Sequence, residues 1–303
     1  MIKNSSVLSI SGITKKFGDL TAVKDLSLKL SKGVICGLLG PNGAGKTTTI
    51  RMIMNIIIPD RGEIKILGKK MDEKLKEKIG YLPEERGLYP KMKVDDLLRF
   101  FAGIKGISKN KAKNRINYWL ERLEIADWRT KKINELSKGM QQKIQFILTI
   151  FNDPQLFILD EPFIGLDPIN TELFKDIILE LKQKGKTILF STHIMEQAEK
   201  LCDEICLINK GENILSGKLN QIKRNFGKNT VIVEYQGDGD IFRNSADIAK
   251  YNDYGNYVEL ELREQVESQS FLKKIIDKVN IQKFEVMEPS LNQIFIESVK
   301  KSS

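Results

Sequence analysis

Cysteine and histidine are scarce in this chain. Its 303 residues include three cysteines, Cys36, Cys202 and Cys206, and one histidine. An odd number of cysteines argues against a disulfide framework, so we expect reduced thiols. Cys202 and Cys206 stand one helical turn apart, but no further cysteine or nearby histidine completes the ligand set that zinc needs. Small buried apolar side chains are therefore the favoured interpretation of these cysteines over a zinc site.

Long apolar runs are also missing from the sequence. The richest apolar stretch, residues 144–151, is interrupted by Gln145 and Thr149, whereas a helix needs about 20 apolar residues to cross a bilayer. Residues 1–6 lack the apolar run of a secretory signal. We therefore expect a cytoplasmic protein that does not span the membrane.

Positive charge is in excess, with a formal net charge of +9. Clustered lysine and arginine side chains would suit a nucleic acid or an anionic membrane surface. The densest basic stretch, residues 105–132, is equally consistent with a solvated helical face. Charge alone does not choose between these interpretations.

The order of apolar runs and helical patterns predicts the architecture. Short apolar runs such as 34–39, 156–159 and 187–190 are typical of strands buried on both faces, and helical patterns follow them. This alternation predicts an α/β fold with a largely parallel sheet. We expect one domain over residues 1–217 and a small α+β domain over residues 218–303.

Both predicted domains contain further elements. In the first, residues 94–125 are predicted to be helical, with Leu97, Leu98, Phe101 and Ile104 on one apolar stripe. This pattern indicates an inserted helical subdomain over residues 92–150, approximately. In the second domain, strands are predicted at residues 230–235, 257–262 and 281–286, separated by helices and turns.

A glycine-rich segment directly follows the first of the buried strands. It matches the G-x-x-x-x-G-K-[ST] pattern of a phosphate-binding loop. Glycines let backbone N–H groups point at phosphate oxygens, and the next helix presents its positive end to them. Lys46 would add a cation, and Thr47 a hydroxyl for Mg²⁺. The predicted ATP-binding residues of this loop are Gly40, Pro41, Asn42, Gly43, Ala44, Gly45, Lys46, Thr47 and Thr48.

Polar side chains follow two other predicted strands. Asp160 and Glu161 end the strand at 156–159, and His193, the single histidine, comes just after the strand at 187–190. In open parallel sheets, ligands bind in the crevice at the carboxyl ends of the strands. Asp160 is therefore predicted to bind Mg²⁺, Glu161 to polarise the water that attacks the γ-phosphate, and His193 to contact that phosphate.

The segment Leu136–Gln142, with the sequence LSKGMQQ, resembles the LSGGQ signature of ATP-binding-cassette (ABC) ATPases. It lies before the two acids, as the signature does in that family. An apolar stripe behind Ser137 would place Ser137 and Gly139 at a helix amino terminus, which suits an anion. An ordinary serine-capped helix is the alternative.

The resemblance implies roles for further residues. Phe17 corresponds to the aromatic residue that stacks on adenine, and Asp167 to the loop that crosses to a partner cassette. Glu84 stands where most members carry a glutamine, so an acid would approach the metal there. Lys138 and Met140 also depart from the usual signature, which leaves Ser137 and Gly139 as its phosphate contacts.

Segments 80–91 and 136–140 are similar to those of the bacterial sodium-extruding (NatA-type) exporter branch of this family. Residues 288–296 are similar to the closing segment of related exporter ATPases, with an amphipathic terminal helix as the alternative. The resemblance implies a homodimer that binds two MgATP head to tail and powers a separate transmembrane permease from the inner face of the membrane. Cargo selection would belong to that permease, so sodium, a drug, a peptide or a lipid all remain open.

Two other functions are consistent with parts of the sequence. A non-transport ABC ATPase acting on nucleic acid or ribosomes would suit the positive charge. Its chromosomal and translation relatives carry long coiled coils or a second cassette, which this sequence lacks, so no nucleic-acid partner is expected. A nucleotide-binding regulator without turnover conflicts with the presence of Glu161 and His193.

Overall fold

The computed structural model describes residues 6–85, 87–226, 229–263 and 265–302. Residues 1–5 and Arg86, which belong to segments interpreted above, lie outside the described residues. The chain separates into two compact units, Met1–Gly217 and Lys218–Lys301. No helix in the described part of the chain is long and apolar enough to cross a membrane.

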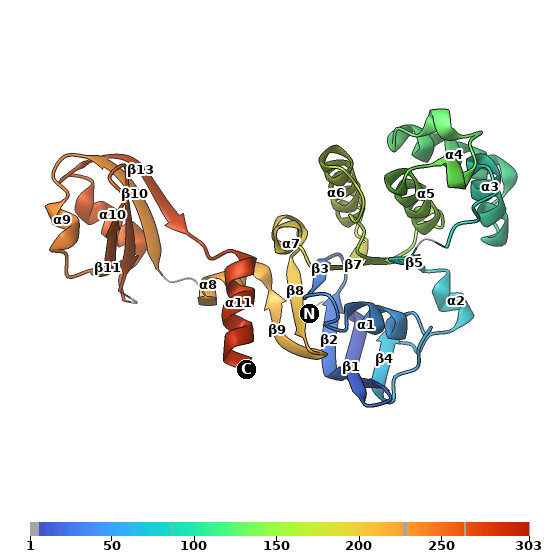
Figure 1. Ribbon diagram of the computed structural model, residues 1–303, viewed down its shortest axis with the longest axis horizontal. Helices are drawn as coiled ribbons and strands as arrows, with labels where there is room; N and C mark the ends of the chain where they lie inside the picture. Colours follow the sequence, from blue (N-terminus) through green and yellow to red (C-terminus); the bar gives the residue numbers. More distant parts are fainter. Residues whose placement is uncertain (1–5, 86, 227–228, 264, 303) are drawn as a thin grey trace, which may run out of the picture. The chain divides into compact units, whose positions relative to one another are not determined.

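The centre of the first unit is a 6-stranded sheet (Figure 1). Its strands are β3 (Ile35–Leu39), β5 (Ile79–Leu82), β6 (Leu156–Asp160), β7 (Thr187–Thr192), β8 (Glu204–Asn209) and β9 (Glu212–Lys218). Their order is β5-β6-β7-β3-β8-β9, and the pairings from β5 to β8 are parallel. All residues of β3, β6 and β7 are buried, which confirms the prediction from their apolar runs.

A second, 3-stranded sheet in this unit was not predicted. Strands β1 (Ser6–Phe17), β2 (Leu20–Ser31) and β4 (Arg61–Ile66) pair antiparallel in the order β2-β1-β4. The signal was present in β2, where Leu26, Leu28 and Leu30 alternate with exposed residues, as in a strand with one solvated face. Helix α1 (Lys46–Ile53) joins a core of residues from both sheets.

The remaining helices of the first unit are short or moderate in length. They are α2 (Glu73–Lys76), α3 (Val94–Ile104), α4 (Lys109–Arg122), α5 (Lys138–Ile150), α6 (Pro168–Gln183) and α7 (Met195–Leu201), with 3-10 turns at Ala126–Trp128 and Ile133–Glu135. Figure 1 shows α5 and α6 across the 6-stranded sheet from α1.

The segment predicted to be helical over residues 94–125 divides into α3 and α4. Gly106 adopts a left-handed backbone with φ of 68° between them, a conformation that glycine tolerates best. Leu97 and Leu98 are buried as predicted, but Ile104 is 65% exposed. Ile104 is the last residue of α3, so it shares the predicted stripe, but its side chain faces solvent and the buried part of the stripe ends before it.

Cations stabilise the ends of these helices. Lys143 Nζ donates to the carbonyl oxygen of Leu123, just past α4, and Lys105 Nζ donates to that of Leu148 in the last turn of α5, both at 2.7 Å. Arg115 donates to the carbonyl of Phe151, just past α5. Positive charge is favourable at helix carboxyl ends. Burial lowers the pKa of both lysines, and the charges of Glu124 and Asp167 partly offset this effect for Lys143.

The second unit is built on a 4-stranded antiparallel sheet in the order β11-β12-β10-β13. The predicted strands correspond to β10 (Thr230–Gln236), β12 (Val258–Leu262) and β13 (Asn280–Met287). The additional strand β11 (Ile248–Asp253) has mostly exposed or half-buried residues, so no alternation marked it. The helices are α8 (Leu219–Phe226), α9 (Asp240–Arg243), α10 (Ser268–Ile275) and α11 (Leu291–Ser302).

The cysteines are free, and two of them lie on different elements from those assumed. Cys202 follows α7, and Cys206 lies in β8, so the interpretation that one helical turn separates them is wrong. Burial raises the pKa of the Cys206 thiol to about 12. Cys36 and Cys206 are buried and Cys202 is half-buried, as expected of small apolar side chains. No group of histidine, cysteine or acidic side chains that could hold a metal occurs among the described residues.

We predict that a truncated chain ending at Gly217 folds and binds ATP. The first unit has its own buried core from both sheets and α1, and a unit with its own core can fold alone. Circular dichroism and calorimetry with ATP would test this, with the full chain as the reference. Insoluble protein, or the loss of ATP binding, would place the boundary elsewhere.

Candidate functional site

Parallel pairing brings three strand ends to one edge of the 6-stranded sheet. Asp160 at the end of β6 is in register with Ser191 in β7, and Leu39 at the end of β3 is in register with Thr192. The residues that follow these strands are therefore neighbours, although they are far apart in sequence. This edge collects the glycine-rich loop, the acidic pair and His193.

The glycine-rich loop is packed so closely that side chains are excluded at two positions. A Cβ atom on Gly40 would lie 2.2 Å from the carbonyl oxygen of Ile208, and one on Gly45 would lie 2.5 Å from that of Ala22. α1 begins directly after Gly45. The loop thus places backbone N–H groups and a helix amino terminus beside the same space, an arrangement suited to phosphate.

A cavity of about 560 Å³ opens at this loop. It is lined by the predicted residues Phe17, Asn42, Gly43, Gly45, Lys46, Thr47, Thr48, Glu84 and Glu161, and also by Leu20, Thr21, Ala22 and Lys210. Phe17 is 48% exposed at the end of β1, as a stacking surface for a base would be. The last four residues were missed because their positions depend on how β2 and the β8–β9 turn pack against the loop.

Three oxygen-bearing side chains meet beside α1. The hydroxyl of Thr47 donates toward Glu84 Oε2 at 3.3 Å and toward Asp160 Oδ1 at 3.4 Å. Asp160 is fully buried, and its Oδ2 atom has no hydrogen-bond partner in the part of the chain described. Burial raises the pKa of Asp160, and the charges of Glu84 and Glu161 raise it further. The arrangement leaves a buried carboxylate oxygen available to a cation.

Glu161 lies between a cation and the histidine. Its Oε1 atom is 3.6 Å from Lys46 Nζ and 2.9 Å from His193 Nδ1. The backbone of Glu161 is left-handed, with φ of 48°, a strained conformation for this residue type. Its N–H donates to Ser191 Oγ at 2.9 Å, and Ser191 in turn donates to Asp160. Ser191 was not predicted, and only the β6–β7 register reveals its contact with both acids.

Lys46 is directed into the loop. Its Nζ atom donates to the carbonyl oxygens of Gly40 at 2.9 Å and Pro41 at 3.2 Å. The side chain is only 6% exposed. A buried cation is therefore held beside the space that the loop encloses.

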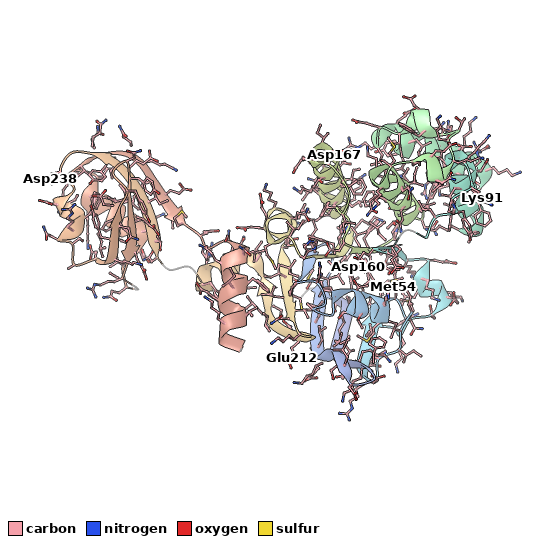
Figure 2. All side chains as sticks on the ribbon, in the orientation of Figure 1. Met54, Lys91, Asp160, Asp167, Glu212 and Asp238 are labelled. Carbon is pink, nitrogen blue, oxygen red and sulfur yellow. The ribbon has the colours of Figure 1, made fainter. Side chains whose placement is uncertain are left out.

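Ser137, Gly139 and Asp167 do not line this cavity. Ser137 caps α5 by accepting a hydrogen bond from Met140 N at 3.3 Å. Asp167 caps α6 by accepting one from Asn170 N at 2.9 Å, and this bond lowers the pKa of Asp167. Asp160 and Asp167 lie well apart in Figure 2. A Cβ on Gly139 would lie 3.1 Å from the carbonyl oxygen of Gly165, so the two caps belong to neighbouring segments.

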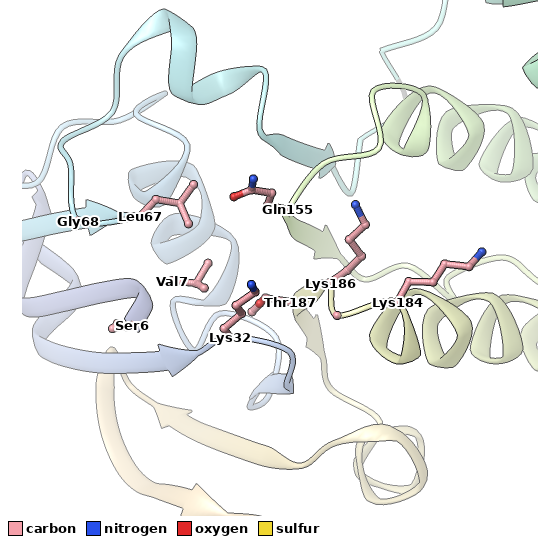
Figure 3. Close-up of a pocket in the computed structure, with 10 residues that line it drawn as sticks. Ser6, Val7, Lys32, Leu67, Gly68, Gln155, Lys184, Lys186 and Thr187 are labelled. Atoms are coloured by element: carbon pink, nitrogen blue, oxygen red, sulfur yellow. The ribbon is translucent and has the colours of Figure 1, made fainter. Parts of the chain in front are cut away.

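A larger cavity, of about 670 Å³, lies at the other edge of the sheet (Figure 3). Its lining includes Lys32 before β3, Gln155 before β6 and Lys184 and Lys186 before β7. Lysines near the end of α6 are explained by the negative pole of that helix. The described residues that line this cavity include no acid and no glycine-rich loop, so the smaller cavity is the candidate site.

Together, the glycine-rich loop, the helix that starts at its lysine and the acids at the adjacent strand end define a P-loop nucleoside-triphosphate-binding protein. The family model described as "ABC transporter" matches residues 23–164, and that described as "ATP-binding protein DrrA1-3-like, C-terminal domain" matches residues 217–299. The chain belongs to the ABC transporter ATP-binding proteins, a family of ATPases.

Relatives match nearly the whole chain. The Uncharacterized ABC transporter ATP-binding protein YhaQ of Bacillus subtilis is 46% identical over 97% of this chain and 98% of its own length. The linearmycin resistance ATP-binding protein LnrL of the same species is 33% identical over 96% of this chain and 97% of its own. The B. subtilis ABC transporter ATP-binding protein NatA is 36% identical over 71% of this chain and 91% of its own, which confirms the predicted similarity.

A solved structure supports the fold. The structure described as an ATP-binding subunit of an ABC transporter aligns with a TM-score of 0.68 and 31% sequence identity. It covers 73% of this chain, and 93% of its own chain is matched. The predicted P-loop fold of the ABC ATPase type is thereby confirmed.

We predict that Lys46→Ala lowers ATP affinity by about one to two orders of magnitude, because it removes a charged donor from the phosphate site. Calorimetry measures the effect. Lys184→Ala, in the larger cavity, is the matched control and should leave affinity unchanged. Equal affinities for the Lys46 variant and the unaltered chain would contradict the phosphate role of Lys46.

We also predict that Asp160→Asn stabilises the nucleotide-free protein at neutral pH. Because the pKa of Asp160 is raised in the folded protein, ionisation of this carboxyl lowers the free energy of unfolding at pH values above the ordinary carboxyl pKa. Below that pKa the carboxyl is protonated in both the folded and the unfolded state, so it no longer destabilises the fold. The thermal midpoint should rise by a few degrees at pH 7 and be unchanged below about pH 4. Exposed Asp19→Asn is the control. A lower midpoint at pH 7 would contradict this account.

Proposed function

We propose that this chain is the MgATP-hydrolysing subunit of an exporter, in which two copies act together on a separate transmembrane permease. The observation that carries this proposal is the convergence of Lys46, Thr47, Asp160, Glu161 and His193 at one sheet edge. Nucleotide binding without hydrolysis would require only the loop and its lysine. A carboxylate that is hydrogen-bonded to a histidine and lies beside that lysine adds the groups expected for hydrolysis.

Mg²⁺ fits the oxygen atoms around Thr47. The Thr47 hydroxyl, the free Oδ2 of buried Asp160 and the Glu84 carboxylate are hard oxygen donors, which Mg²⁺ prefers together with nucleotide phosphates and water. Bound there, the ion would neutralise charge on the β- and γ-phosphates. It would also remove the repulsion that raises the pKa of Asp160.

Glu161 is the proposed general base. An ionised carboxylate only accepts hydrogen bonds, so the 2.9 Å contact has His193 Nδ1–H as its donor. This bond fixes the Glu161 side chain and leaves its other oxygen to accept a proton from the attacking water. Lys46 would turn from the carbonyls of Gly40 and Pro41 to the phosphates, where its charge stabilises the transferred group.

A pair of cassettes explains the position of the signature segment. Ser137 and Gly139 are at a helix amino terminus that does not line this chain's own cavity, so their phosphate contact would be made to a nucleotide bound by a second copy. The nearby loop exposes Ile164 at 42%, and the first turn of α6 exposes Ile169 at 79%. Exposed apolar residues beside functional loops are typical of an interface.

An exposed aromatic cluster after Glu84 is the proposed permease contact. Tyr89 and Phe100 are 51% and 45% exposed, with ring centroids 6.0 Å apart, and Phe101 lies 5.6 Å from Phe100. Aromatic residues are enriched in protein interfaces. The short segment between Glu84 and Tyr89 would connect the metal site to that contact and hold the chain at the inner face of the membrane.

Export is supported by the relatives, but they do not agree on one cargo. LnrL is named for linearmycin resistance, and the chain also resembles the sodium-extruding branch. Both are consistent with movement of a substrate out of the cell. We propose export without choosing between an ion and an amphiphilic compound, because the permease would form the cargo pathway.

We predict that Glu161→Gln slows ATP hydrolysis by about 10²–10⁴-fold while ATP still binds, because the substitution removes the base and keeps the shape. Bound ATP should then trap the paired state, so size-exclusion chromatography with MgATP should show a dimer. Hydrolysis at the unaltered rate would remove Glu161 as the base.

Adding Ser137→Arg to that variant should return it to a monomer, because a long cation at the α5 cap blocks contact with the partner's nucleotide. The control is Ser216→Arg in the same background, which changes a serine outside α5. A dimer that survives Ser137→Arg would contradict the head-to-tail arrangement.

A further inference from the structure

Helix α5 carries polar side chains into the protein interior. It starts directly after Ser137, and its residues 142–150 are all buried. Gln142 and Gln145 are three residues apart and therefore lie on the same side of the helix. Buried amides are retained where they find partners, and the partners of these two glutamines lie in the two loops that carry Glu161 and Glu84.

Gln142 is hydrogen-bonded to the loop that follows Glu161, the proposed base. It has no exposed surface, and its Nε2 atom donates to the carbonyl oxygen of Pro162 at 3.1 Å. Pro162 directly follows Glu161, whose backbone is already in the left-handed region. The hydrogen bond therefore restrains the peptide that sets the direction of the Glu161 side chain.

Gln145 is hydrogen-bonded to the backbone of the two residues that flank Glu84. Its Nε2 atom donates to the carbonyl oxygens of Pro83 at 3.4 Å and Glu85 at 3.3 Å. Arg51 of α1 also forms an ion pair with the exposed side chain of Glu85 at 3.4 Å. The backbone on both sides of Glu84 is thus hydrogen-bonded to α5.

One helix therefore contacts three parts of the hydrolytic apparatus. Its first residue follows Ser137, its buried side touches the loop after Glu161, and the next turn touches the loop around Glu84. An α-helix is stiff over this length because each turn is hydrogen-bonded to the next. A displacement of its amino terminus would be transmitted to both loops.

We propose that Gln142 and Gln145 are positioning residues that link the signature end of α5 to the placement of Glu161 and Glu84. The inference rests on the proposed function, in which Ser137 contacts the partner's nucleotide. Contact at Ser137 would then favour hydrolysis of the ATP held by the same chain. Neither glutamine touches the nucleotide cavity, so each acts through an acid.

The chain offers a matched control on the same helix. Lys143 is also buried and donates through Nζ, but to the carbonyl oxygen of Leu123, and the hydrogen bond that it makes among the described residues reaches neither acidic loop. Methionine keeps the length and volume of glutamine and removes the donor. Gln142→Met and Gln145→Met are therefore to be compared with Lys143→Met, and a cooperative thermal transition shows that each variant is folded.

Binding measurements test Gln145. In a background that carries both Glu161→Gln and Ser137→Arg, ATP is not hydrolysed and the chain is expected to stay monomeric. There, the affinity for ATP with excess Mg²⁺ divided by the affinity with EDTA, both measured by calorimetry, reports how well the protein holds the metal. Gln145→Met should reduce this ratio by about fivefold, as Glu84→Gln should, whereas Lys143→Met should leave it unchanged. Combined with Glu84→Gln, Gln145→Met should have no further effect, because it acts through Glu84.

Steady-state kinetics test Gln142. Gln142→Met should lower kcat by about fivefold with the affinity for MgATP unchanged, and Lys143→Met should change neither. If methionine at position 142 prevents folding, Gln142→Leu serves as the second variant. A fall in affinity with kcat unchanged, or equal effects of the Gln142 and Lys143 variants, would overturn the assignment of Gln142.

The outcomes separate this inference from the proposed function. Additive effects of Gln145→Met and Glu84→Gln, or an equal effect of Lys143→Met, would overturn the positioning role of Gln145. An unchanged ratio for Glu84→Gln alone would remove Glu84 from the proposed metal site. Full hydrolysis by Glu161→Gln would remove the base itself, whatever the glutamine variants do.

Discussion

Parallel pairing of β3, β6 and β7 is the constraint on which the site depends. These strands are buried on both faces, so a shift of one residue would reverse which side chains meet each neighbouring layer. The register is therefore fixed by packing, and it sets Asp160 beside Ser191 and Leu39 beside Thr192. The loop, the acids and the histidine inherit their relative positions from this pairing.

The site gathers like charges that the fold alone does not neutralise. Asp160 is buried near Glu84 and Glu161, and its raised pKa reflects burial first and these charges second. Lys46 lies close enough to pair with Glu161. Such an arrangement gains stability when a cation and phosphates bind, because each ligand removes a repulsion or satisfies a donor. Binding of the cation and the phosphates should therefore increase the local stability of this end of the sheet.

The proposed phosphate contacts lie in two separate places in one chain. The glycine-rich loop encloses a cavity, whereas Ser137 and Asp167 cap helices outside it. One copy thus offers a cavity and, elsewhere, a second set of helix-end contacts. The buried amides of α5 connect these two places within the chain, which gives a physical route by which occupancy of one could influence the other.

The sequence by itself determined the elements whose chemistry is local. The spacing of Gly40, Gly45 and Lys46, the buried apolar strands and the acids after β6 were all predicted because glycine geometry and apolar runs are properties of short segments. Tertiary structure alone decided the contacts between distant segments. Ser191, Lys210 and Gln145 were missed, the exposure of Ile104 at the end of α3 was not predicted, and Cys202 and Cys206 were assigned to one helix. Each of these depends on which strands pair, where a helix ends and which loop packs beneath it, and such long-range packing leaves no periodic pattern in the chain itself.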